Sequence, residues 1–155
     1  MRRATPILGT ALLLLWTAGT LAAQAKPNFA GTWVQDKDKT TAANASAAPG
    51  QQPAWSKVTI RQDDKNFTVE LTGNNGQAQP RAYVTDGAPH KIAMGQQEAT
   101  YTAKWDGNTV VIEQTAQGRN GAPQVTKYVF SMDGNQLVVT TTQGTATRKG
   151  IYNKS

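Results

Sequence analysis

The sequence predicts an all-β protein, an up-and-down antiparallel β-barrel of about eight to nine strands. Apolar and polar residues alternate with period two from Trp55 onward, as in half-buried strands. Asp-Gly pairs separate several of these runs, and such pairs favour tight hairpin turns. An open sheet of this size leaves two exposed edges, whereas a barrel pairs its first strand with its last. We therefore expect sequential hairpins that close into one barrel.

The first 25 residues predict a secretory signal peptide that is removed after Ala25. A positive start, Met1-Arg2-Arg3, precedes a mostly apolar segment at 7–18, and Ala23-Gln24-Ala25 places small residues at the cleavage junction. Threonine and glycine interrupt the apolar run, which falls short of the roughly 20 residues of a membrane span. We expect a secreted or periplasmic mature domain, 26–155, with no stable membrane span after cleavage.

The mature chain opens with Asn28-Phe29-Ala30-Gly31-Thr32-Trp33, which starts the first predicted strand. Segment 37–54 follows and contains no large apolar residue, so it has nothing to bury against a core. Its alanines permit a short helix, but Pro49, Gly50 and Pro53 stop one. We expect 37–54 to be a mobile loop.

Period-two runs predict the remaining strands. The strands at 58–60 and 67–71 form a hairpin across a polar turn, and a weaker strand lies at 81–85. Segment 88–95 is expected to be irregular. Further strands are expected at 99–105, 110–112, 125–132, from 137 onward and at 146–152.

Composition excludes several classes of function. The chain has 155 residues, no cysteine and a formal net charge of +6. Without cysteine there is no disulfide, no thiolate nucleophile and no cysteine-based zinc site. The basic residues are scattered, whereas a nucleic-acid surface needs clustered charge with stacking aromatics. We expect no nucleic-acid partner, no cofactor and no metal, and the sequence does not specify a protein partner.

Catalytic patterns are equally weak. His90 is the only histidine and lies in a Pro-flanked loop with Asp86 and Lys91 nearby. No nucleophile elbow or activating neighbour accompanies it, so we expect a solvated loop histidine. The aspartate pairs, such as Asp63-Asp64, lack the ligand spacing of a calcium loop and fit turn chemistry. We therefore expect a protein that is not an enzyme.

Gly31-Thr32-Trp33 looks like the Gly-x-Trp signature of lipocalins. The chain resembles a group of small, secreted, lipocalin-like bacterial proteins through this start, the Trp105-Asp106-Gly107 hairpin and a last strand with Arg148 and Tyr152. The resemblance spans nearly all of the mature chain and implies the fold but no activity. In lipocalins the signature tryptophan closes one end of the barrel under an arginine of the last strand. The resemblance therefore implies that Gly31, Trp33 and Arg148 close the barrel and that any ligand enters at the end opposite Trp33.

Two functions remain open. The barrel carries a small, mainly apolar ligand, or it is solid and acts through its surface as an envelope interaction or inhibitor protein; an enzyme ranks third. An apolar pocket of about 300 Å³ or more distinguishes the first from the second. Side chains of the predicted strands either line such a lumen or simply fill it. The candidates are Ile60, Phe67, Val69, Tyr101, Trp105, Tyr128 and Phe130.

Overall fold

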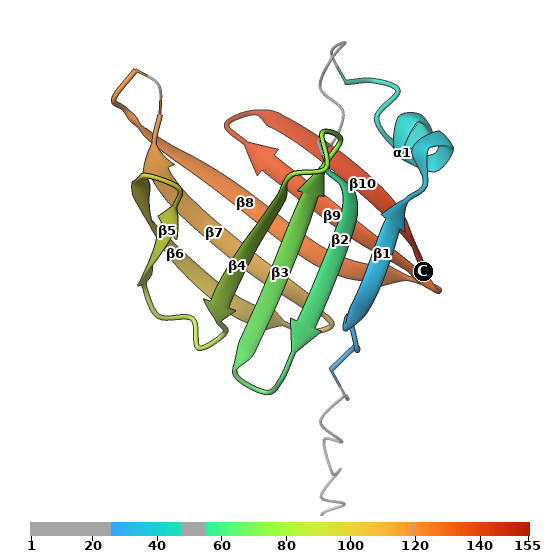
Figure 1. Ribbon diagram of the computed structural model, residues 1–155, viewed down its shortest axis with the longest axis horizontal. Helices are drawn as coiled ribbons and strands as arrows, with labels where there is room; N and C mark the ends of the chain where they lie inside the picture. The colour runs from blue at the N-terminus through green and yellow to red at the C-terminus, as the bar shows by residue number, and fades with distance from the viewer. Residues whose placement is uncertain (1–25, 48–54, 119) are drawn as a thin grey trace, which may run out of the picture.

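The computed structural model describes residues 26–47, 55–118 and 120–155, which form a 10-stranded antiparallel sheet rolled into a nearly closed barrel (Figure 1). One short helix, α1, accompanies the sheet in these ranges. The elements are β1 (Gly31–Gln35), α1 (Lys37–Ala43), β2 (Trp55–Gln62), β3 (Asn66–Gly73), β4 (Ala78–Val84), β5 (His90–Met94), β6 (Gln97–Asp106), β7 (Thr109–Gln117), β8 (Pro123–Asp133), β9 (Gln136–Gln143) and β10 (Ala146–Lys154).

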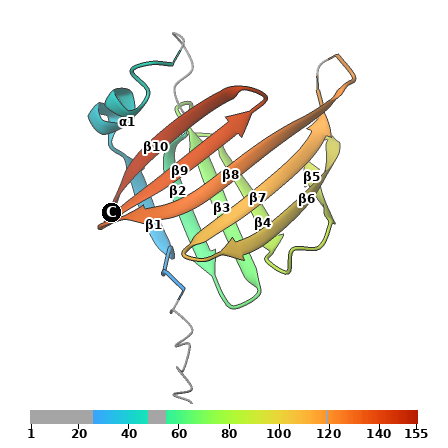
Figure 2. The ribbon, with the colours of Figure 1, turned by 180° about the vertical axis from the view of Figure 1, so that it is seen from behind.

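The strands follow the predicted up-and-down order. Each strand pairs with its sequence neighbour except at β4 and β5, and β1 pairs with β10, so the sheet runs β4-β3-β2-β1-β10-β9-β8-β7-β6-β5. Figure 2 shows the β6–β10 wall from behind, where adjacent strands stay side by side along most of their length. The prediction of an all-β barrel with paired first and last strands is confirmed. The two remaining edges, β4 and β5, flank a gap in the wall.

The expected count of eight to nine strands omitted β5. Segment 88–95 contains this strand, which pairs with β6 from His90↔Tyr101 to Met94↔Gln97. It is only five residues long and lies between Pro89 and Gly95, so its alternation is too short to stand out.

The expectation of a mobile loop beginning at residue 37 is wrong for α1. Asp36 caps the helix by accepting a hydrogen bond from Lys39 N at 3.1 Å. Two polar residues, Thr40 and Asn44, are buried where the helix meets β10. Residues 48–54 of that expected loop lie outside the described residues.

Polar side chains of α1 and its C-cap form hydrogen bonds with the part of the β10 edge that β1 does not cover. Along β10, only the last residues, 152–154, pair with β1. Farther back, Lys149 N donates to Asn44 Oδ1 at 2.9 Å, and Asn44 Nδ2 donates to Lys149 O at 2.6 Å. Ile151 N donates to Thr40 Oγ1 at 3.0 Å. These side chains take the hydrogen bonds that a neighbouring strand would otherwise make.

The stretch just before β1 closes one end of the barrel, where the chain enters this strand (Figure 1). Phe29 is fully buried, stacks on Trp105 with ring centroids 5.8 Å apart and meets Phe67 edge-on at 6.0 Å. Trp33 Nε1 donates to Phe29 O at 2.8 Å, which fixes this turn of chain under the core. Phe29 therefore plugs this end of the barrel.

The implied pairing of Trp33 with Arg148 is wrong. The cation over the Trp33 ring is Lys154, whose Nζ lies 5.4 Å from the ring centroid and whose backbone is in register with Trp33. Arg148 lies toward the other end of β10, in register with Thr141 of β9. The last strand continues beyond Tyr152, so register brings Lys154 to the closed end in place of the arginine.

Candidate functional site

The seven candidate lumen residues all belong to the barrel core or pack against it. One cavity among the core side chains has a volume of about 10 Å³, room for at most a single water. Its lining consists of Val69, Leu71, Arg81, Tyr83, Ile112, Tyr128 and Phe130. The core side chains around this cavity are therefore closely packed and leave no room for a ligand at that place.

A polar layer lies above this packed core, and Arg81 is its centre. Arg81 shares the inward face of β4 with Tyr83 and is only 8% exposed. One guanidinium nitrogen donates to Gln79 Oε1 at 3.1 Å, and another donates to the Tyr128 hydroxyl at 3.5 Å. Both acceptors are neutral, so the buried charge of Arg81 has no carboxylate partner among these contacts.

Tyrosine and glutamine extend the layer toward β7. Burial raises the pKa of Tyr83 to about 12, although the neighbouring Arg81 cation acts in the opposite direction. The Tyr83 hydroxyl donates to Gln114 Oε1 at 3.4 Å, and Gln114 Nε2 contacts the sulfur of Met94 at 2.6 Å. A hydrogen-bonded chain thus crosses the barrel from β4 through β7 to β5.

Arg148 is a second inward-facing cation. It shares the inward face of β10 with Gly150 and Tyr152, and its Nε is buried with no hydrogen-bond partner in the described part of the chain. The ion pairs of the described residues are His90–Asp86, Lys91–Glu98 and Lys127–Glu113, and none involves an inward arginine. Arginine does not deprotonate in proteins. The interior therefore carries positive charge without a matching carboxylate.

The sequence prediction missed Arg81 and named Arg148 only as a barrel-closure residue, not as a ligand-site residue. It treated the strand at 81–85 as weak and did not assign its faces, and it placed Arg148 at the closed end. The signal that identifies them is parity: Arg81 lies two residues from buried Tyr83, and Arg148 lies two residues from buried Gly150.

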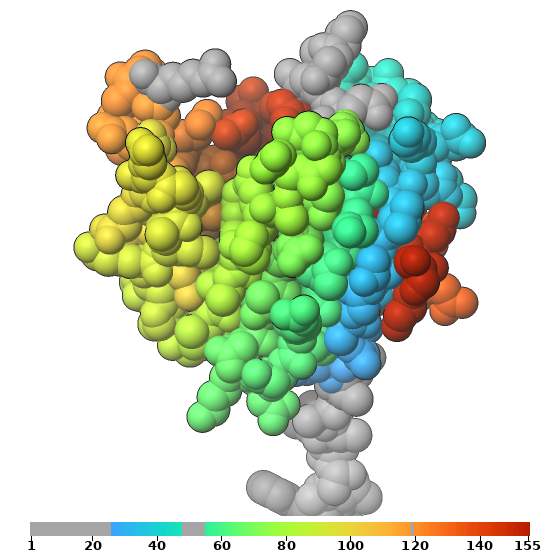
Figure 3. Space-filling view, viewed as in Figure 1, coloured from blue at the N-terminus to red at the C-terminus, as the bar shows by residue number. Residues whose placement is uncertain are grey.

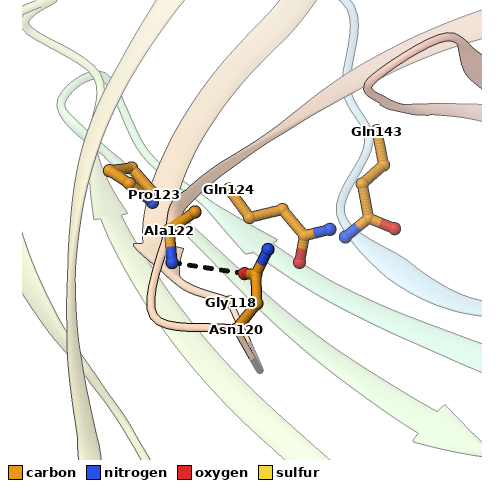
Figure 4. Close-up of a pocket in the computed structure, with 6 residues that line it drawn as sticks. All are labelled: Gly118, Asn120, Ala122, Pro123, Gln124 and Gln143. Atoms are coloured by element: carbon orange, nitrogen blue, oxygen red, sulfur yellow. Dashed lines mark hydrogen bonds between the residues drawn. The ribbon is translucent and has the colours of Figure 1, made fainter.

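Larger hollows lie at the end of the barrel opposite Phe29. One, of about 610 Å³, is lined by Gly118, Asn120, Ala122, Pro123, Gln124 and Gln143. Figure 4 shows three carboxamides, from the β7–β8 turn, β8 and β9, extending into this space, with Asn120 Oδ1 accepting from Ala122 N at 3.2 Å. In Figure 3 the orange β7–β8 hairpin and the green β3–β4 turn stand on two sides of a depression. This mouth hollow is polar and uncharged.

A second hollow, of about 520 Å³, lies in the gap between the edge strands β4 and β5. It is lined by Ala78, Gln79, Pro80, Arg81, Ala93, Met94 and Gly95. A third hollow, of about 360 Å³, lies beside the β3–β4 turn and is bounded by Trp55 of β2. The gap hollow differs from the other two large hollows because Arg81, a buried cation, is one of its lining residues.

His90 does not lie in a loop, contrary to the prediction. It belongs to β5, and its ring stacks on Tyr101 with centroids 5.4 Å apart. Its Nε2 lies 2.9 Å from Asp86 Oδ1, and this hydrogen bond holds the pKa of the Asp86 carboxyl below its usual range. The Tyr101 hydroxyl accepts from Val84 N at 3.0 Å. This group joins β4, β5 and β6 at the lower end of the gap.

Within the described ranges, no group of three or more His, Cys, Asp or Glu side chains is arranged to hold a metal ion. None of the helices described is long and apolar enough to cross a membrane.

No protein-family model and no curated protein sequence matches the chain. Similar solved structures include secretory abundant heat soluble protein 4 from Ramazzottius varieornatus, at 15% identity and TM-score 0.58, covering 85% of this chain and 99% of that one. Apo lipid binding protein 8 from Caenorhabditis elegans has 12% identity and TM-score 0.58, covering 82% and 95%. The fatty acid transporter REP1-NXSQ has 16% identity and TM-score 0.56, covering 81% and 95%. The chain therefore has the lipocalin and fatty-acid-binding type of barrel fold.

Proposed function

We propose that the protein is a non-enzymatic barrel that binds a small, mainly apolar ligand and recognises the anionic end of that ligand. The observation that carries this proposal is Arg81, a guanidinium that is 8% exposed, faces the barrel interior and contacts only neutral acceptors. A buried charge without a counter-charge is costly, and a ligand carboxylate supplies one with bidentate geometry. Arg148, whose buried Nε is unpaired, adds a second positive charge on the inward face.

The surrounding geometry is compatible with a ligand of this kind. The gap hollow, at about 520 Å³, has the size of ordinary small-molecule pockets. The Tyr128 hydroxyl beside Arg81 supplies a further donor for an oxyanion. The names of two similar structures, a lipid binding protein and a fatty acid transporter, support a ligand with an apolar portion.

The packed lumen favours a second candidate. The cavity of about 10 Å³ beside Arg81 is too small for a ligand, as expected of a solid barrel. A solid barrel acts through its surface, as an envelope interaction or inhibitor protein. Ligand binding and surface binding make opposite predictions for a purified protein offered a small amphiphile.

Isothermal titration calorimetry on the delipidated protein distinguishes the two functions. Three probes of equal chain length differ only in head group: dodecanoate, dodecanol and dodecyltrimethylammonium. We expect dodecanoate to bind at least about tenfold more tightly than the alcohol, which corresponds to about 1.4 kcal/mol, and the cation to bind least. No binding contradicts the proposal and favours the surface candidate. Equal affinity for all three contradicts recognition of an anionic end.

Arg81→Met tests the residue assignment, and Arg61→Met is its matched control. Arg61 lies on the exposed face of β2, so its loss removes one positive charge without touching the interior. We expect Arg81→Met to weaken dodecanoate binding about tenfold or more, whereas Arg61→Met leaves it unchanged. Equal losses in both variants would indicate a non-specific charge effect.

We also propose that the protein is exported and that its leader is removed after Ala25. The charged start, the apolar segment and the small-residue junction in residues 1–25 support this proposal. Mass spectrometry of the exported protein is expected to give an N-terminus at Lys26. A mass that retains the first 25 residues would contradict it.

A further inference from the structure

The gap between β4 and β5 is an opening in the barrel wall, because these two strands are the unpaired edges of the sheet. Val84 N points into the gap, because it donates to Tyr101 across it. Backbone nitrogens two and four residues away point to the same side of a strand, so the nitrogen of Pro80 also faces the gap. Proline has no N–H, and β5 is only five residues long. These two edges cannot form a continuous hydrogen-bonded ladder with each other.

The gap is anchored at one end and open at the other. Below it, Gly87 N donates to Ala103 O at 2.8 Å, and Asp86 forms an isolated bridge with Lys104. Together with the Tyr101–Val84 hydrogen bond, these contacts tie the β4–β5 connection to β6. The hollow of about 520 Å³ lies toward the other end of β4, between the beginning of that strand and the end of β5. A chain-like ligand therefore has room to pass through the wall above the anchored end.

The lining of the gap changes in character from its inner to its outer part. Arg81 is buried at the inner side, whereas Ala78, Pro80 and Ala93 are exposed apolar residues, and Met94 is half-buried. Methionine and proline provide an adaptable apolar wall. The gap has one carboxamide, Gln79, whose oxygen already accepts from Arg81, whereas the mouth hollow has three. An alkyl chain placed in the mouth would desolvate more polar groups without replacing their hydrogen bonds.

We propose that the gap is the entrance and tail subsite for an alkyl-chain anion: the anionic end pairs with Arg81, and the alkyl chain runs outward between Pro80 and Met94. This inference rests on the proposed function and adds the orientation and route of the ligand. It places the tail through the side of the barrel and not through the amide-lined mouth.

Two alanine-to-phenylalanine substitutions distinguish entry through the gap from entry through the mouth hollow. Ala93→Phe fills the gap, and Ala122→Phe places the same ring in the mouth hollow; both positions are exposed, so neither ring has to enter the core. In calorimetry with dodecanoate we expect Ala93→Phe to reduce affinity about tenfold, and Ala122→Phe to change it less than about twofold. Urea unfolding of each variant confirms that the fold is intact.

A second measurement locates the chain without any substitution. A fatty acid that carries a nitroxide near its methyl end is added to ¹⁵N-labelled protein, and amide signals near the nitroxide broaden. We expect the amides of Ala78 and Ala93 to broaden before those of Asn120 and Gln143. Broadening confined to Asn120 and Gln143, or an affinity loss only in Ala122→Phe, overturns the side route.

The results also separate this inference from the proposed function. If dodecanoate binds and depends on Arg81 but neither phenylalanine affects it, the gap proposal fails and the binding proposal stands. If dodecanoate does not bind the unmodified protein, both proposals fail.

Discussion

The hydroxyl of Tyr101 on β6 accepts a hydrogen bond from the backbone nitrogen of Val84 on β4, at 3.0 Å, across the break in the barrel wall. The same ring meets Tyr83 edge-on at 4.9 Å and stacks on His90 at 5.4 Å. One side chain therefore connects the two edges that the backbone leaves unpaired, and its hydroxyl can be removed without removing its ring.

Tyr101→Phe is expected to lower the free energy of unfolding by about 0.5–1.5 kcal/mol, because Val84 N loses its acceptor while the ring contacts persist. Hydrogen exchange at the Val84 amide is expected to accelerate. Thr102→Val, one residue away on the opposite face of β6, serves as the control for a general effect on the strand. Unchanged exchange at Val84 would show that Tyr101 does not hold the edges together.

Asn44→Ala is expected to lower the free energy of unfolding by about 1–3 kcal/mol, because it leaves Lys149 N and Lys149 O on β10 without their partner. Urea denaturation measures the loss, and hydrogen exchange at Lys149 identifies its site. Lys37→Gln, an exposed change in the same helix, is expected to have little effect. Equal effects of the two changes would contradict the role of Asn44 as a substitute for a strand partner.

Arg148→Met and Lys154→Met are expected to change stability in opposite directions. The Nε of Arg148 is buried and has no hydrogen-bond partner among the described residues. Replacing Arg148 with an apolar side chain is therefore expected to raise the free energy of unfolding by about 1 kcal/mol. Lys154 lies over Trp33, and its loss is expected to lower the free energy of unfolding by about 0.5 kcal/mol. Thermal unfolding measures both; a destabilised Arg148→Met would contradict the interpretation of Arg148 as an uncompensated charge.

The parts of the fold that the sequence predicted are those governed by apolar burial. Period-two alternation identified the long strands, because one face of each packs in the core. The opening stretch supplies two of these buried apolar side chains, Phe29 and Trp33. The helix α1 was missed because polar hydrogen bonds from Thr40 and Asn44 dock it, and no apolar period marks such contacts.

The candidate site was less predictable, because it depends on strand register and on charged residues. A charged residue in a strand is normally assigned to the solvent face, and only the neighbouring burial pattern places Arg81 inside. Arg148 was assigned to Trp33 through the resemblance to lipocalins, whereas register pairs it with Thr141. Pairing partners between distant strands are not encoded in the alternation of any single strand.

The buried phenol of Tyr83 gives the protein a pH dependence that can be tested. Burial raises its pKa from the ordinary value of 10.0 to about 12 in the folded protein. The Tyr83 hydroxyl thus keeps its proton to a higher pH in the folded state than in the unfolded state. The corresponding stability is fully present below about pH 10 and is lost as the pH rises toward about 12, a total of about 2.7 kcal/mol for two pKa units.

Urea unfolding of the wild type and of Tyr83→Phe across this range measures the contribution. Tyr152, whose pKa burial also raises, and the lysines titrate in both proteins, so their contributions cancel in the difference. Below about pH 9 the variant is expected to be less stable by about 1 kcal/mol, because Gln114 loses its donor. Above about pH 11 the order is expected to reverse, since phenylalanine has no proton to lose. Parallel stability curves at all pH values would show that Tyr83 titrates normally and is not buried in the polar layer beside Arg81.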